Sequence, residues 1–395
     1  MIHEPYPAKE TTKMPMNLNS KADTLPIEVQ QQIGKLSHKM LILGFAAFFE
    51  KLEEGPILRT FFFKPSEGSL FSKILNKEEE LAGTLNVESV RIERNAGLVA
   101  IEVPREDRIT IRFDSCLHEL LTSPQVRDMQ LPLLMGQNTR GDYLYADLAT
   151  QPHLLMAGTT GSGKSVATSQ FIASLALFKS PKELSFTLVD TKQLDLVFFE
   201  DLEHVSSVIR EVEDLRASLE SALAEVRRRT QLMSGYARNI AEWNNLGMGQ
   251  KLKYKVIIMD EFADIIQQDE ILWAGTPKKD RPTSIEMLTK QIAAISRAAG
   301  IHLIIATQRP SVRVLSGDLK ANFPARICFK LPTMADSRVV LDENGAECLL
   351  GKGDYLYKIA GSDVLKRAHS AYVSTQDIAL VTSQHNEIRR TYVFS

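Results

Sequence analysis

A glycine-rich segment at residues 158–165 constrains the fold of this chain more than any other feature of its sequence. It fits the pattern G-x-x-x-x-G-K-[ST] at every position, follows a short apolar run, and opens a helical stretch at residues 166–178. Glycines let backbone N–H groups turn inward around phosphate oxygens, and the start of the helix adds a partial positive charge. The segment therefore predicts a phosphate-binding loop between a buried strand and a helix. The residues expected to bind nucleotide are Gly158, Thr159, Thr160, Gly161, Ser162, Gly163, Lys164, Ser165 and Val166.

The lysine and the hydroxyl residue of such a loop have separate roles. Lys164 would reach the β- and γ-phosphates of a nucleoside triphosphate, and the Ser165 hydroxyl would bind Mg²⁺. A GTPase should carry an Asn-Lys-x-Asp motif that reads the base. Residues 76–79 (Asn-Lys-Glu-Glu) lack the aspartate and precede the loop, so they fail that pattern. ATP and Mg²⁺ are the expected ligands.

Two adjacent carboxylates end a second apolar run, at residues 255–261. Asp260 would act in the Mg²⁺ shell, and Glu261 would polarise an attacking water. Carboxylates at strand ends are common, but beside a phosphate loop this pair indicates a triphosphate hydrolase more than a kinase. Gln308 ends a third apolar run, where it would orient the γ-phosphate or its water. The alternative for Gln308 is a hydrogen-bonded strand end with no part in hydrolysis.

The alternation of apolar runs and amphipathic stretches predicts the architecture. From about residue 131, short continuous apolar runs at residues 154–157, 186–189, 256–259, 303–306 and 326–329 are separated by helical patterns. Such a series is typical of a mainly parallel sheet covered on both faces. We therefore expect an α/β domain over residues 126–395. A small α+β domain at 33–125, opening with a helix at 33–54, and a flexible leader at 1–32 would precede it.

Composition sets limits on environment and partners. The 47 basic and 49 acidic side chains nearly cancel, so a polyanion would have to bind a local basic surface. The three cysteines, at positions 116, 328 and 348, show no disulfide or metal spacing, which favours a reduced, cytoplasmic setting. The longest apolar run, residues 40–49, is about half the length that a membrane-spanning helix needs. No signal peptide and no membrane insertion are expected.

These motifs resemble, in order, those of the FtsK/SpoIIIE DNA translocases, within the HerA–FtsK group of motors. The resemblance covers about residues 55–373 and is most specific at residues 153–166, 260–264, 300–311 and 319–327. Residues 336–338, 345–347 and 349–354 continue it, whereas the small module before the motor matches only weakly. The resemblance implies a RecA-like P-loop NTPase in a hexameric ring, with double-stranded DNA in the channel. Arg297 takes the position of an arginine finger from the neighbouring subunit, the alternative being a solvated helix-end arginine.

Departures from the family pattern narrow this expectation. The chain shows neither the membrane-spanning helices nor the C-terminal winged-helix domain of full-length members, which favours a free-standing motor of a plasmid, phage or other mobile element. The segment at residues 267–283 looks like an inserted surface loop. The leader would recruit a partner protein. A competing function is an ATPase that moves a protein in a secretion-type system, although those relatives carry tandem ATPase modules.

A cluster of arginines supplies the candidate DNA contacts. Duplex binding by such motors needs a few basic side chains per subunit that reach phosphates. The candidates are Arg227, Arg228, Arg229 and Arg238. A glycine-containing turn at residues 234–236 separates the first three from the fourth and suits a loop that faces a pore. A helix face on which these arginines pair with acids such as Glu225 is the equal alternative.

Overall fold

The computed structural model describes residues 21–362 and 364–392, which form two compact units. The smaller unit comprises the described residues up to Glu53 together with Arg59–Pro104. The larger unit comprises Glu54–Leu58 and the chain from Arg105 onward. Most of the predicted leader lies outside the described residues. Residues 27–32, which were assigned to it, belong to the first helix.

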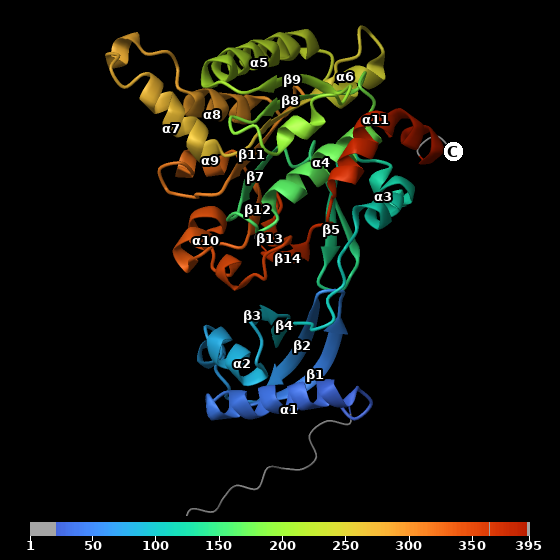
Figure 1. The fold of residues 1–395 in the computed structure, drawn as a ribbon, viewed down its shortest axis with the longest axis vertical. Coiled ribbons are helices and arrows are strands. Elements are labelled where there is room, and N and C mark those ends of the chain that lie inside the picture. Colours follow the sequence, from blue (N-terminus) through green and yellow to red (C-terminus); the bar gives the residue numbers. More distant parts are fainter. Residues whose placement is uncertain (1–20, 363, 393–395) are drawn as a thin grey trace, which may run out of the picture. The chain divides into compact units, whose positions relative to one another are not determined.

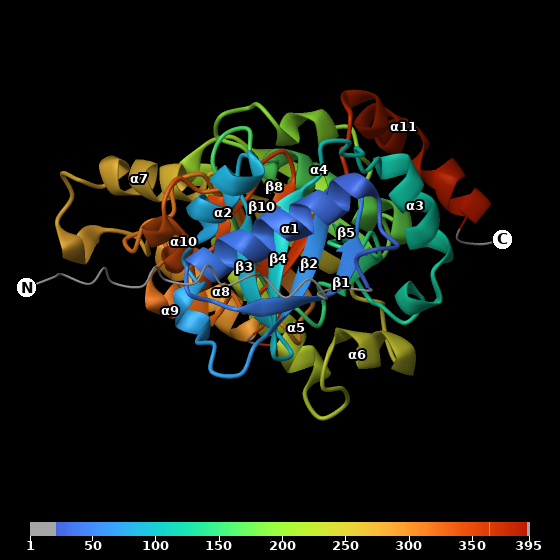
Figure 2. The same ribbon diagram turned by 90° about the horizontal axis from the view of Figure 1, so that it is seen from below.

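The smaller unit is a four-stranded sheet with two helices packed on it. The strand order is β1-β2-β4-β3, and α1 lies across the sheet with α2 beside it (Figures 1 and 2). Residues of α1 and the strands, among them Leu36, Met40, Phe61 and Phe63, are fully buried in its core. Its elements are α1 (Ile27–Ile42), β1 (Ala47–Glu54), β2 (Leu58–Pro65), the 3-10 turn η1 (Phe71–Lys73), α2 (Glu78–Leu85), β3 (Arg91–Asn95) and β4 (Leu98–Pro104).

The helix predicted at residues 33–54 is wrong in its second half, which forms the strand β1. Helix α1 ends in a turn around Gly44, whose φ of 77° is a left-handed conformation that glycine adopts at low cost. There the backbone N–H of Phe45 donates to Met40 O (2.9 Å) and that of Gly44 to Leu41 O (2.9 Å). This is the hydrogen-bond pattern that closes many helices. It turns the chain into β1.

The division between the two units precedes the boundary expected at residue 125. Helix α3 (Phe113–Thr122) falls within the range expected for the small domain. Its Phe113, Cys116 and Leu120 are nevertheless buried in a core of the larger unit. The short turn η2 (Pro124–Val126) follows α3. Because one face of α3 is buried in that core, these residues belong to the larger unit, which puts the division after Pro104.

The larger unit is built on a ten-stranded sheet of order β6-β5-β14-β13-β12-β7-β11-β10-β8-β9. The strands from β12 to β9 are parallel, which confirms the mainly parallel α/β fold. The sequence patterns did not indicate the antiparallel strands β13, β14, β5 and β6 on the other side. Besides α3 and η2, its elements are β5 (Pro132–Asn138), β6 (Tyr143–Asp147), β7 (His153–Ala157), α4 (Lys164–Phe178), β8 (Leu184–Val189), η3 (Leu196–Phe199), β9 (Val205–Ile209), α5 (Val212–Met233), α6 (Ile240–Leu246), β10 (Tyr254–Met259), α7 (Phe262–Leu272), η4 (Lys278–Asp280), α8 (Ile285–Ile295), β11 (Ile301–Thr307), α9 (Gly317–Ala321), β12 (Ala325–Phe329), α10 (Met334–Leu341), η5 (Ala346–Cys348), β13 (Asp354–Lys358), β14 (Lys366–His369) and α11 (Thr375–Tyr392).

Successive residues of the parallel strands enter two different cores, one on each face of the sheet. In β7, Leu154 and Met156 pack with α3, α4 and α11, whereas Leu155 and Ala157 pack with α5, α7, α8 and α10. Figure 1 shows α4 and α11 together against the sheet. Because both faces are covered, the strands read as continuous apolar runs in the sequence. The carboxyl ends of β7, β10 and β11 thus lie side by side at one edge, where the functional loops begin.

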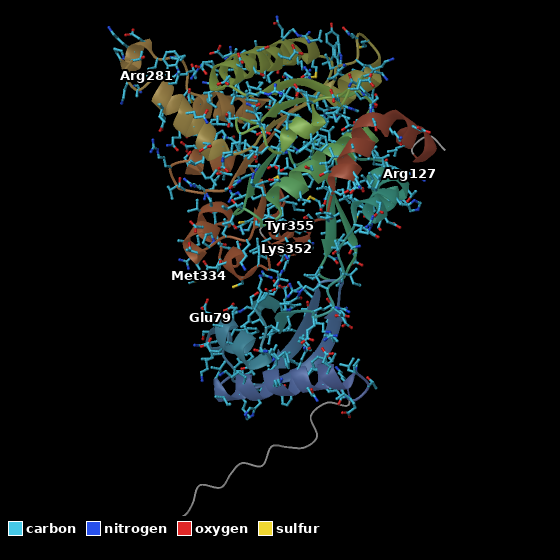
Figure 3. The ribbon with its side chains drawn as sticks, viewed as in Figure 1. Glu79, Arg127, Arg281, Met334, Lys352 and Tyr355 are labelled. Carbon is cyan, nitrogen blue, oxygen red and sulfur yellow. The ribbon has the colours of Figure 1, made fainter. Side chains whose placement is uncertain are left out.

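Two further expectations from the sequence concern an inserted loop and membrane-spanning helices. The inserted loop expected at 267–283 begins as the last turns of α7 and continues through η4, and Arg281 lies on this outlying segment in Figure 3. Asp269, within it, is buried and paired with Arg216. In the part of the chain that the structure describes, no helix is both long and apolar enough to span a bilayer.

Candidate functional site

The predicted phosphate loop joins β7 to α4, and two glycines with positive φ shape it. Gly161 has a φ of 76° and Gly163 a φ of 108°. A Cβ on Gly163 would lie 2.3 Å from the backbone nitrogen of Gly353, so this close approach admits only glycine. The backbone N–H of Gly353 in turn donates to Ser162 O (2.8 Å). The loop is therefore braced from outside by the turn before β13.

Two polar groups of this loop suit a phosphate ligand. The Ser162 hydroxyl is buried and has no hydrogen-bond partner among the described residues. Because a buried polar group without a partner is costly, it is suited to donate to a bound oxygen. Lys164 is 3% exposed and forms an ion pair with Asp260, the residue that follows β10. The structure thus places the lysine of the phosphate loop in contact with the first of the two carboxylates that follow β10.

The oxygen donors expected for Mg²⁺ fit that ion chemically. Ser165 is the second residue of α4, next to the Lys164–Asp260 contact. A hydroxyl with a single carboxylate leaves the remaining positions for phosphate oxygens and water, as Mg²⁺ prefers. No group of three or more His, Cys, Asp or Glu side chains arranged to hold a metal occurs among the described residues. The role of Ser165 and Asp260 as metal ligands stays a prediction.

Glu261 is buried and held by the end of β11. Its Oε1 accepts hydrogen bonds from the Thr307 hydroxyl (3.0 Å) and from the backbone N–H of Gln308 (3.1 Å). Its own backbone takes the left-handed conformation, with φ of 53°, which directs the chain from β10 into α7. Lys192, beyond β8, lies 3.8 Å from Oε2. Thr307 and Lys192 were not singled out in the sequence, although both occur where a buried strand meets polar residues.

Gln308 connects this carboxylate to the phosphate loop. While its backbone N–H binds Glu261, its side-chain Oε1 accepts a hydrogen bond from the Thr160 hydroxyl (2.8 Å). Gln308 also lines the same cavity as Lys164 and Ser165. The structure therefore brings together every residue proposed for hydrolysis except Arg297. A residue in this position can respond to what the phosphate loop binds.

The cavity over the phosphate loop has a volume of about 640 Å³ and extends well beyond the motif. Part of its wall consists of residues that sequence reasoning missed. They are Arg108, Ile109, Thr110, Leu194, Asp195, Ser370, Ala371 and Tyr372. Ile109 and Tyr372 lie more than 200 positions apart in the chain, so only the fold brings them together.

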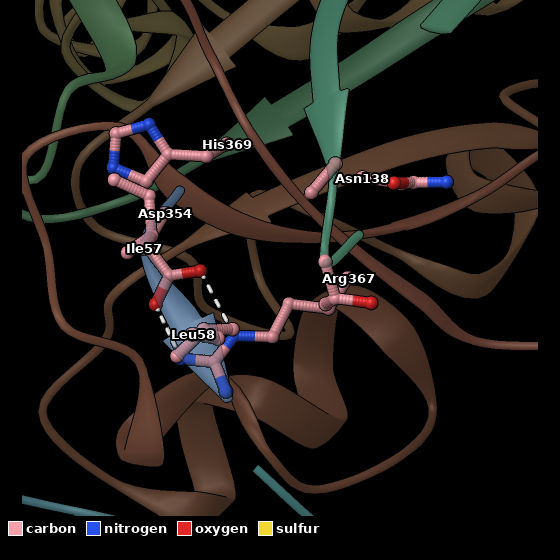
Figure 4. A pocket seen from close by; sticks show the side chains of 8 residues that line it. Ile57, Leu58, Asn138, Asp354, Arg367 and His369 are labelled. Atoms are coloured by element: carbon pink, nitrogen blue, oxygen red, sulfur yellow. Dashed lines mark hydrogen bonds and ion pairs between the residues drawn. The ribbon is translucent and has the colours of Figure 1, made fainter. Parts of the chain in front are cut away.

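A buried ion pair supports the turn that braces the phosphate loop. Asp354, the first residue of β13, and Arg367, on the neighbouring strand β14, are joined by two hydrogen bonds of 3.0 and 2.6 Å (Figure 4). Burial raises the pKa of Asp354, but the Arg367 guanidinium outweighs burial, so the pKa lies below its usual value. The same carboxylate accepts the N–H of Leu350 (2.8 Å). Figure 3 labels Lys352, in the turn before β13, and Tyr355, on β13.

Arg297 lies away from this cavity in its own chain. It is exposed and follows α8, before the amino end of β11, whereas Gln308 follows the carboxyl end of the same strand. It is not among the residues that line the nucleotide cavity. Arg297 is therefore not part of its own chain's site, and its assignment as a finger for a neighbouring subunit stays a prediction.

The four candidate DNA-binding arginines differ in their surroundings. Arg229 is buried, and its guanidinium donates to the carbonyls of Lys253 and Ala299 (2.8 Å each), so it stabilises the fold instead of presenting a charge. Arg228 pairs with Glu225, and Arg228 first and then Arg229 lower the pKa of Glu225 to about 2. Arg227 is exposed on α5.

Arg238 follows the turn after α5 and is exposed. Its side chain is 89% exposed and pairs with Glu242 one helical turn later. Arg228 and Arg229 therefore lie on the acid-paired helix face of one alternative. Arg238 lies on a loop, and its contact with DNA stays a prediction.

Comparisons with known proteins agree with this geometry. A profile of the FtsK/SpoIIIE family matches residues 117–249, and one of the FtsK alpha domain matches residues 12–105. The chain is 34% identical to the DNA translocase FtsK of Rickettsia typhi over 91% of its length, and 36% identical to that of Campylobacter jejuni over 89%. It spans 52% and 36% of those relatives, respectively.

Solved structures share the fold. The pCW3 conjugation coupling protein TcpA superimposes with a TM-score of 0.61 at 23% identity, covering 91% of this chain and 99% of that one. The cytoplasmic domain of the Thermomonospora curvata type VII secretion ATPase EccC gives a TM-score of 0.58 at 25% identity, covering 70% and 34%. The phosphate loop, the paired carboxylates after β10, the glutamine after β11 and the two matching profiles together lead to one conclusion: the chain belongs to the FtsK/SpoIIIE family.

Proposed function

We propose that this chain is an ATP-driven motor that moves along or pumps double-stranded DNA in the cytoplasm, and that it works as a ring of identical subunits. The observation that carries the proposal is the network joining Lys164, Asp260, Glu261 and Gln308 at three adjacent strand ends. It occurs in a chain whose relatives over nine-tenths of its length are DNA translocases.

Each residue of the network has a task in hydrolysis. Lys164 would exchange Asp260 for the β- and γ-phosphates of ATP, because both are anionic partners at the start of α4. Ser165 and Asp260 would hold Mg²⁺, whose charge, when bound, offsets that of the phosphate oxygens. Glu261 would accept a hydrogen bond from the attacking water, and Gln308 would replace its Thr160 contact with the γ-phosphate.

The exposed position of Arg297 supports a site shared between subunits. A cation at the γ-phosphate stabilises the charge that develops during phosphoryl transfer, and this chain's own Arg297 is at the opposite end of β11. In a ring, the same residue of the neighbouring subunit would supply that cation. Hydrolysis would then depend on assembly, which we expect to be hexameric.

The loop after α5 is the part of the motor that we assign to DNA. Arg238 is nearly fully exposed, and Arg227 lies exposed near the end of the preceding helix. Contacts of this kind bind phosphates without reading sequence, so they suit a motor that must pass over any sequence. Glu242 pairs with Arg238 and would yield to a phosphate, which is also an anion.

Duplex-stimulated ATP hydrolysis tests the proposal. Steady-state ATPase rates measured with increasing linear duplex DNA should rise several-fold, and Lys164→Ala should abolish both basal and stimulated rates. Arg238→Gln should weaken the stimulation and leave the basal rate unchanged. A rate that does not respond to duplex DNA at low salt, in a preparation that hydrolyses ATP, would count decisively against a DNA motor.

The fold likeness to EccC supports one alternative, an ATPase that moves a protein. The two functions differ in what stimulates hydrolysis. A protein-moving ATPase would respond to a cargo polypeptide and be indifferent to DNA, and its rate would be insensitive to Arg238→Gln. The same titration therefore separates the two.

A further inference from the structure

The nucleotide cavity has two sides, which the phosphate-loop strand β7 divides. On one side, β11 and β10 lead to Gln308 and to the paired carboxylates. On the other side, β12, β13 and β14 lead to residues 350–353 and 369–372, which line the same cavity. Since the γ-phosphate must lie towards the carboxylates to be hydrolysed, the rest of a nucleotide has to extend towards β13 and β14.

Two large apolar side chains are exposed on that second side. Ile109 is 60% exposed and Tyr372 is 56% exposed, and both line the cavity over the phosphate loop. Apolar groups left in contact with water inside a cavity are typical of a ligand site, because a ligand with an apolar face removes them from water. The base is the part of ATP that presents such a face.

Backbone hydrogen bonds fix Tyr372 against the segment that follows Ile109. The N–H of Tyr372 donates to Ile111 O (2.8 Å), and the N–H of Phe113 donates to Tyr372 O (3.2 Å). The preceding residue, Ala371, is tied to α4, since its N–H donates to the side chain of Gln170. Tyr372 is therefore fixed beside the same helix whose first turn carries Lys164 and Ser165.

We propose that Tyr372 and Ile109 form the nucleobase subsite, with the tyrosine ring stacked on the base and the isoleucine against it. The assignment rests on the proposed use of ATP. Stacking needs a flat π-face, which phenylalanine would supply as well as tyrosine. The loss of one such contact weakens binding about tenfold, equivalent to about 1.4 kcal/mol. The triphosphate end, bound by the phosphate loop, does not depend on it.

The test compares a nucleotide that has a base with a polyphosphate that has none. Affinities of wild type, Tyr372→Ala and Tyr372→Phe for ATPγS are measured by calorimetry, and inorganic tripolyphosphate is measured as a competitor. Tyr372→Ala should bind ATPγS about tenfold more weakly and tripolyphosphate unchanged, whereas Tyr372→Phe should restore ATPγS binding. Phe48→Ala, at an exposed aromatic that lines no part of this cavity, is the matched control.

Equal weakening of ATPγS and tripolyphosphate would overturn the proposal, because it would indicate a distorted phosphate loop. Unchanged ATPγS binding in Tyr372→Ala would also overturn it. Ile109→Ala, which removes a smaller contact, should weaken ATPγS a few-fold and leave tripolyphosphate unchanged, so the proposal can be tested even if Tyr372→Ala misfolds. Binding is measured without turnover. A chain that binds ATPγS through Tyr372 but ignores DNA would refute the motor and leave the subsite standing.

Discussion

Arg367 and Asp354 form an ion pair that solvent scarcely reaches, since each side chain is 2% exposed. Replacing Arg367 with methionine keeps much of the side chain's volume but leaves the Asp354 carboxylate buried without its cation. Removing one partner of a buried pair costs about 3–5 kcal/mol of folding free energy. Asp354 also accepts the Leu350 N–H, in the turn that braces the phosphate loop. Arg367→Met should therefore lower both stability and ATP affinity.

The double variant Arg367→Met/Asp354→Leu separates the charge from the packing. It removes both charges and leaves mainly the Leu350 N–H without an acceptor, at a cost of about 1–3 kcal/mol, so it should be more stable than Arg367→Met alone. Urea unfolding followed by tryptophan fluorescence reports the larger unit, because both tryptophans, Trp243 and Trp273, lie in it.

Arg238→Met provides the matched control for this measurement. It breaks an ion pair of the same kind whose arginine is 89% exposed, so water already screens the charges and the urea midpoint should stay close to that of the wild type. The reasoning is refuted if Arg367→Met costs no more than this control, or if the double variant is less stable than the single one.

Three further predictions follow from contacts of the larger unit. Thr307→Val removes the hydroxyl bound to Glu261 and should lower kcat several-fold with KM for ATP unchanged; Thr307→Ser should restore it, and equal rates for both variants would exclude a role for the hydroxyl. Burial lowers the pKa of His153 to about 3 and of His302 to about 4, so the folded state resists protonation. The contribution of these two neutral histidines to the free energy of unfolding is complete above pH 6.5. It should be lost as pH falls towards 4, by up to about 1.4 kcal/mol per pH unit for each histidine. Urea midpoints that stay constant between pH 7 and 5 would contradict this. Arg238→Gln should reduce the salt dependence of duplex binding by about one phosphate contact, measured by fluorescence anisotropy, and an unchanged slope would remove this residue from the DNA interface.

The parallel half of the fold could be predicted because its signals are local. Strands buried on both faces read as continuous apolar runs, and a phosphate loop fixes one of them as β7. The helix expected at 33–54 failed because one glycine, Gly44, ends α1, and the apolar residues after it suit either kind of element. The place of β5 beside β14 could not be predicted, because that pairing joins segments more than 200 residues apart, whereas β5–β6 and β13–β14 each pair strands that follow one another in the chain.

The candidate site also has a part that could be predicted from the sequence and a part that could not. Lys164, Asp260, Glu261 and Gln308 each belong to a short motif whose chemistry is readable at its position. The cavity wall at Tyr372 is different, because a single tyrosine carries no signal until the fold places it beside α4. Arg229 shows the converse error: its charge suggested DNA, but its burial and its two carbonyl partners show that it holds α5 in place.

Displacement of a third strand from a triplex tests the central claim most directly, because it reports movement along a duplex and not binding alone. With ATP, the wild-type protein should release a fluorescent triplex-forming strand from the end of a linear duplex. Glu261→Gln, which keeps the side chain's size but cannot activate water, should bind ATP and DNA and release none. Release without ATP, equal release by Glu261→Gln, or ATP hydrolysis on duplex DNA with no release would contradict a DNA translocase.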